Sequence, residues 1–133
     1  MVARINGTAW TATCITTASF SGGVISLGAT DGAQSIGLSI TFKGLGDYTM
    51  TPLDPLNPPN QLMLASGLVN LLPTSAASWT ANSGTPGSSG TLTLTGFTTT
   101  AVAGTFSFIA VATAGTGATG TKVVTSGGFN ITF

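Results

Sequence analysis

The chain has 133 residues, carries no net charge at pH 7, and contains no Glu and no His. Charged residues make up 5% of it, whereas a typical globular domain has about 25%. The charged residues are Arg4, Asp31, Lys43, Asp47, Asp54 and Lys122. This composition excludes most acid–base and nucleophilic enzyme chemistry, which depends largely on His and on carboxylates.

The remaining composition fits a folded domain with an uncharged, hydroxyl-rich surface. Leu, Ile, Val and Phe total 33 residues, which exceeds the share of roughly 20% below which chains tend to be disordered. Ala, Gly, Ser and Thr supply another 73 residues. We expect a single β domain spanning residues 1–133, because this length fits one core of ordinary size.

The first part of the chain alternates apolar with small polar residues, the period of a half-buried strand. The clearest case is Gln34–Phe42, where Ile36, Leu38 and Ile40 alternate with Ser and Gly. Gly44 and Gly46 follow, so we expect the next segment to return as the second strand of a hairpin. The strands predicted here are Ala3–Thr16, Val24–Ala29, Gln34–Phe42 and Asp47–Met50.

The segment Thr51–Pro73 breaks this pattern. Four prolines up to Pro59 favour an extended loop without regular pairing. Leu64, Leu68 and Leu71 then recur with the spacing of one helix face, which predicts one short helix near residues 62–72. A strand over Gln61–Ala65 followed by a loop is the alternative.

Short strands separated by Gly-rich turns continue to the C-terminus. They are Thr91–Thr95, Thr105–Ala112 and Gly128–Phe133. We expect the last strand to pair with the first strand or with another subunit. The regular short strands predict an all-β fold, an antiparallel β-sandwich or a flattened barrel, because the two share the period of two.

Composition also limits partners. Three scattered basic residues cannot neutralise a row of phosphates, so we expect no nucleic acid partner. No apolar run approaches 18 residues, so we expect no membrane-spanning helix. The single cysteine, Cys14, allows no disulfide within the chain, and its strand-like surroundings predict a buried small side chain.

We expect no catalytic residue, no cofactor and no metal site. A Ser-His-Asp or Cys-His arrangement cannot exist without His. One Cys is too few for zinc. Asp31, Asp47 and Asp54 sit beside Gly or Pro, where Asp commonly makes local turn hydrogen bonds.

Five residues are candidates for sugar chemistry. Trp10, Tyr48 and Trp79 could form a stacking platform for a carbohydrate, while the alternative places the two indoles at the core edge with their N–H groups bonded. Asn6 and Asn130 begin Asn-X-Thr sequons and are candidate glycosylation sites.

Several strand-and-turn motifs together carry a resemblance. They are Ala3–Trp10, Leu38–Ile40 leading to Gly46–Tyr48, Ser89–Thr95, Gly104–Phe108 and Val124–Phe129. With them the chain resembles a family of uncharacterised bacterial cell-surface domains that often follow a lipoprotein signal. The resemblance implies an all-β fold and an exported location, and no known activity or catalytic residues. It also favours a signal peptide already removed before Met1.

Zero net charge removes the repulsion that keeps most soluble domains apart. We therefore favour a non-enzymatic structural subunit of an extracellular or cell-surface assembly, such as a filament, sheath or surface layer, whose main partner is itself. One alternative is a monomeric surface binding module for a small apolar ligand or a carbohydrate. Another is a virion or phage-tail structural protein.

Overall fold

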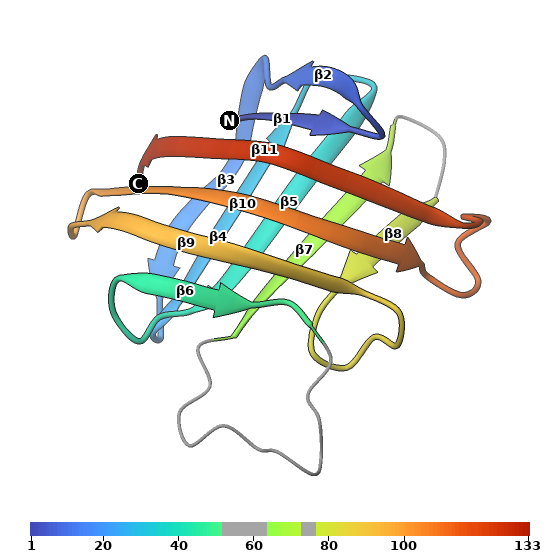
Figure 1. Ribbon diagram of the computed structural model, residues 1–133. Helices are drawn as coiled ribbons and strands as arrows, with labels where there is room; N and C mark the ends of the chain where they lie inside the picture. Colours follow the sequence, from blue (N-terminus) through green and yellow to red (C-terminus); the bar gives the residue numbers. More distant parts are fainter. Residues whose placement is uncertain (52–63, 73–76) are drawn as a thin grey trace, which may run out of the picture.

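The computed structural model describes residues 1–51, 64–72 and 77–133, and eleven β-strands fill most of them (Figure 1). Every pair of neighbouring strands is antiparallel, which confirms the predicted all-β antiparallel fold. The strands are β1 Val2–Ile5, β2 Thr8–Thr11, β3 Cys14–Ser21, β4 Val24–Thr30, β5 Gln34–Thr41, β6 Gly46–Thr49, β7 Ala65–Leu71, β8 Ser78–Ala81, β9 Ser89–Phe97, β10 Ala101–Ala112 and β11 Thr121–Thr132.

The twelve-residue strand β10 divides the sheet into two layers. One edge of β10 pairs with β11 along most of its length. The other edge pairs first with β9, from Val102 to Ile109, and then with β8 at Val111 and Ala112. The front layer therefore runs β2-β1-β11-β10-β9-β6, and the back layer runs β8-β7-β5-β4-β3. Figure 1 shows the two layers facing each other with their strands crossing, a half-barrel consistent with a sandwich or flattened barrel.

The apolar core lies between the layers, and the predicted alternation decides which residues enter it. In β5, Ile36, Leu38 and Ile40 are buried, while the residues between them lie on the opposite face. The final strand does pair with the first strand, since β11 lies between β1 and β10. Ile131 and Phe129 of β11 are buried by this arrangement.

Glycines make room for three phenylalanine rings in this core. Gly127 lies opposite Phe106 across the β10–β11 pair, and an added Cβ there would come within 2.5 Å of the ring. Gly104 lies opposite Phe129 in the same pair, so each strand provides a ring and a glycine. Gly67 of β7 takes the ring of Phe108 from the other layer, with an added Cβ 2.8 Å from Cε1. The rings therefore fill space that any other residue would occupy with its side chain.

The predicted helix near residues 62–72 is wrong. Residues 62 and 63 lie outside the described residues, and the rest of the segment contains strand β7. Leu68 points away from the core, whereas Ala65 and Val69 are buried. The alternative was a strand over Gln61–Ala65 followed by a loop, and residues 61–63 of it lie outside the described residues. The loop is wrong, because strand β7 runs from Ala65 to Leu71. The leucine spacing gave a wrong prediction because the residues of β7 that face the core include the small Ala65 and Gly67, and Gly67 packs against the ring of Phe108.

The predicted hairpin between Gln34–Phe42 and Asp47–Met50 is also wrong. Strand β6 exists, but it pairs with β9 in the front layer, while β5 pairs with β4 and β7. The buried hydroxyl of Tyr48 holds the connection, donating to Gly44 O at 2.6 Å and accepting from Lys43 N at 3.0 Å. Gly44 and Gly46 have strongly positive φ values, a conformation that glycine adopts readily. These two glycines therefore allow the chain to cross from the back layer to the front layer.

We expect the Gly127→Ala variant to lose about 1–3 kcal/mol of unfolding free energy, because its Cβ would overlap the Phe106 ring. Urea denaturation followed by fluorescence measures this loss. Gly37→Ala is the matched control, since its Cβ would make an ordinary 3.6 Å contact with Leu68 Cβ. The control should be neutral or slightly stabilising. Equal stability of the two variants would contradict the close packing of ring on glycine.

Candidate assembly edge

Strand β3 forms the free end of the back layer. Among the described strands it pairs only with β4. All eight of its residues except Ala18 are exposed. Its outer edge therefore presents a row of backbone N–H and C=O groups to solvent, and such a row can pair with another strand.

This edge lacks most features by which proteins protect a free strand. Its sequence, CITTASFS, contains no charge and no proline. The one irregularity is a bulge at Thr16, since Ile15 lies opposite Ala29 while Thr17 lies opposite the adjacent Gly28. The five residues from Thr17 to Ser21 pair regularly with β4. The other two terminal strands, β2 and β6, have only four residues each.

The two faces of β3 differ in chemistry. Ala18 and Phe20 lie opposite Leu27 and Ile25, which are buried, so they lie on the core side. Phe20 is nevertheless 40% exposed. Ser19 lies on the outer side, opposite Ser26. The edge thus has one apolar and one hydroxyl face, both uncharged.

A cluster of four phenylalanines, here called the Phe cluster, lies beside β3 between the two layers. Its members are Phe20, Phe42, Phe97 and Phe133. The ring of Phe97 is central, with centroid distances of 4.9 Å to Phe20, 4.2 Å to Phe42 and 6.2 Å to Phe133. The cluster fills this side of the half-barrel with apolar contacts, while Phe20 remains available to a partner.

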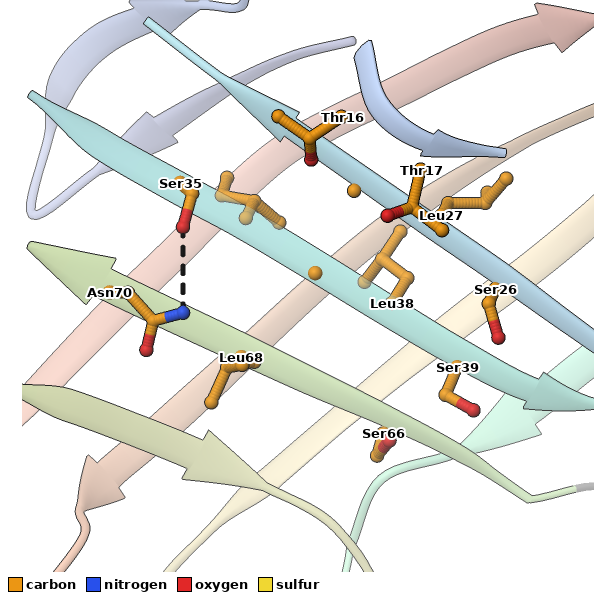
Figure 2. Close-up of a pocket in the computed structure, with 13 residues that line it drawn as sticks. Thr16, Thr17, Ser26, Leu27, Ser35, Leu38, Ser39, Ser66, Leu68 and Asn70 are labelled. Carbon is orange, nitrogen blue, oxygen red and sulfur yellow. Dashed lines mark hydrogen bonds between the residues drawn. The ribbon is translucent and has the colours of Figure 1, made fainter. Parts of the chain in front are cut away.

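The outer face of the back layer carries a row of serines in register. Ser19 pairs with Ser26, Ser26 with Ser39, and Ser39 with Ser66 across four adjacent strands. Three serines of this row, Ser26, Ser39 and Ser66, line a shallow groove of about 350 Å³. Figure 2 shows the hydroxyl groups of the groove and the hydrogen bond that Asn70 Nδ2 donates to Ser35 Oγ, which is 3.5 Å long. Among the described residues, the lining contains no aromatic and no charged side chain and consists of Thr16, Thr17, Ser26, Leu27, Gly28, Ser35, Ile36, Gly37, Leu38, Ser39, Ser66, Leu68 and Asn70.

The three predicted sugar-stacking aromatics lie in the core and are not brought to one surface. Trp10 is 3%, Tyr48 0% and Trp79 6% exposed, so none of the rings offers an open face to a sugar. Trp79 Nε1 donates to Thr119 O at 3.1 Å, and Lys122 Nζ lies 4.7 Å from the centroid of the Trp79 ring. Trp10 Nε1 is buried without a hydrogen-bond partner among the described residues. The indole bond predicted for a core-edge Trp is therefore present at Trp79 only.

Both sequon asparagines are exposed. Asn6 lies in the tight turn between β1 and β2 with φ of 50°, and its Oδ1 accepts a hydrogen bond from Val123 N at 2.8 Å. Asn130 lies on β11, opposite Ala103. Their use as glycosylation sites remains a prediction.

The carboxylates and the thiol are dispersed. Asp31 Oδ1 accepts from Ala33 N and Gln34 N at 2.8 and 2.7 Å, which is the predicted turn role, whereas Asp47 lies on β6 and accepts from Thr93 Oγ1 at 2.6 Å. Asp54 lies outside the described residues. Within residues 1–51, 64–72 and 77–133, no three Asp, Glu, His or Cys side chains gather as metal ligands. The same ranges contain no helix of the length and apolarity needed to cross a membrane.

The expected burial of Cys14 is wrong. The residue is exposed, because it begins the edge strand and no second layer covers it. The single predicted strand Ala3–Thr16 is wrong as well, because the structure divides this segment into β1, β2 and the start of β3. A tight turn with positive φ at Asn6 and Gly7 separates β1 from β2.

Comparison with family models, with curated proteins and with solved structures found no match to this chain. The resemblance to bacterial cell-surface domains remains a prediction from the motifs.

We expect the Cys14 thiol to react fully with Ellman's reagent in the folded protein without denaturant, because the side chain is exposed. Absorbance of the released thiolate follows the reaction. A thiol that reacts only after urea is added would contradict an open β3. The Cys14→Ser variant is the blank.

Proposed function

We propose that this chain is a non-enzymatic, exported structural subunit that assembles with copies of itself at the cell surface or outside the cell. The observation that carries the proposal is β3, an eight-residue edge strand without charge or proline in which every residue but Ala18 is exposed. Strand addition at such an edge supplies backbone hydrogen bonds that need no complementary charges.

The composition supports assembly at that edge. The whole chain has three basic and three acidic residues, so charge repulsion between two copies is weak in any relative orientation. Lysines and inward charges are common devices that keep free edges apart, and β3 has neither. A chain selected to stay monomeric would be expected to carry one of them on its longest free strand.

The two alternatives differ in whether they use the β3 edge. A monomeric binding module for an apolar ligand or carbohydrate would use the shallow groove of the back layer. The described residues that line this groove offer hydroxyl groups but no aromatic ring for stacking. A virion or phage-tail subunit would use the same edge chemistry as a surface filament, so its self-association would depend on β3 in the same way.

Association of the wild-type chain should weaken at least about tenfold in the Ser19→Lys variant, because like charges juxtaposed in an interface cost several kcal/mol. Sedimentation velocity over a range of protein concentrations measures the effect.

Ser39→Lys is the matched control. Ser39 is exposed on the same face and in the same serine row, but it lies on the central strand β5. Its association should stay near the wild-type value. If Ser39→Lys abolishes association while Ser19→Lys does not, the subunits stack through the sheet face and not through β3.

A further inference from the structure

We infer that the occupant of the β3 edge is β3 of a second copy, paired antiparallel about a two-fold axis that passes beside Ser19. This inference rests on the proposed function and adds the partner strand and its register. It concerns Thr17–Ser21, the regular part of the strand between the bulge at Thr16 and the turn at Gly22 and Gly23.

Continuation of the back layer restricts the register. In an antiparallel pair, opposite residues point to the same side of the sheet. A two-fold axis perpendicular to the sheet keeps the core side of both copies on one side of the extended sheet. Each residue must then lie opposite a residue of the same side, an even number of positions away in the sequence. The axis therefore passes beside one residue, which lies opposite its own copy, and not between two residues. Residues 18, 19 and 20 are the centres that such a short segment allows.

Only the centre at Ser19 uses the whole regular segment. It places Thr17 opposite Ser21 of the second copy, and Ser19 opposite Ser19. A centre at Ala18 would extend the pairing into the bulge at Thr16, and a centre at Phe20 would extend it into the turn at Gly22. The Ser19 register therefore forms the most backbone hydrogen bonds without distorting either strand.

The side chains fit this register on both faces. On the core side, each Phe20 lies opposite Ala18 of the other copy, so a large ring meets a small residue, whereas the alternative centres place Phe20 or Ala18 opposite itself. The 40% of Phe20 that is exposed would then be covered next to its contacts with Phe97. On the outer side, the serine row of one copy would continue into the row of the other.

A closed two-fold contact of this kind is isologous, the commonest symmetry of protein assemblies. Pairing of β3 with β2 or β6 of the next copy would be heterologous and would use only four residues of that strand. The isologous pair makes the dimer the first product of assembly, and larger structures would grow through contacts elsewhere on the chain.

Symmetric disulfide formation tests this register. In a Cys14→Ser background, Ser19→Cys should form a covalent dimer under mild oxidation, because opposite Cα atoms in antiparallel strands lie about 4.5–5.5 Å apart, within disulfide range. Ser26→Cys, one strand inward on the same row, is the matched control. Its two copies would lie roughly three strand spacings, about 14 Å, apart and should not cross-link.

A second pair of variants tests the same register if the Ser19→Cys variant fails to fold. Thr17→Cys and Ser21→Cys should each remain uncross-linked alone and should form a covalent heterodimer when mixed, since the register places these positions opposite each other.

Sedimentation of the wild-type protein distinguishes a failure of the two-fold register from a failure of the proposed function. If the wild type associates but neither Ser19→Cys nor the mixed pair cross-links, the two-fold register is wrong and the proposed assembly function stands. If the wild type remains monomeric at the highest concentration reached, the proposed function and the register both fail.

Discussion

The change of partner along strand β10 is the constraint on which the rest of the structure depends. By pairing with β9 over most of one edge and with β8 at its end, β10 belongs to both layers and turns a single sheet into a half-barrel. The core then forms between the layers, and glycines at positions 67, 104 and 127 let the rings of Phe108, Phe129 and Phe106 fill it. The same arrangement leaves the back layer to end at β3, because the barrel does not close on that side (Figure 1).

The part of the fold that sequence reasoning could predict is the part set by local alternation. Strands β4, β5, β9 and β10 follow from apolar residues at every second position, and the pairing of β11 with β1 is one of the two alternatives that the apolar C-terminal strand leaves open. Strand β7 could not be identified this way, because its inward face is made of Ala65, Gly67 and Val69 while a leucine lies outside. The predicted pairing of β6 with β5 is wrong because the true partner of β6, strand β9, is reached by a crossing between layers. The spacing of residues within one segment does not indicate such a crossing.

The candidate assembly edge shows the same division between local and long-range information. The low charge of the chain is visible in the sequence and suggests association. Which strand is free is a property of the sheet order, so the exposure of Cys14 and Phe20 could not be read from their neighbours. Likewise, the sequence left open whether Trp10, Tyr48 and Trp79 form a stacking platform or lie at the core edge, because their common position in the core is a long-range feature. The composition thus predicts a tendency to assemble, and the sheet order indicates β3 as the strand through which assembly would occur.

Amide hydrogen exchange of β3 at increasing protein concentration, read by mass spectrometry, tests assembly at this edge most directly. Before association, the amides that point to the free edge have no partner and should exchange fast. As the chain associates, exchange of the Thr17–Ser21 amides should slow strongly. The amides of the central strand β5, which pairs with β4 and β7, should keep their exchange rate. Exchange over Thr17–Ser21 that stays unchanged in associated protein would contradict assembly through β3.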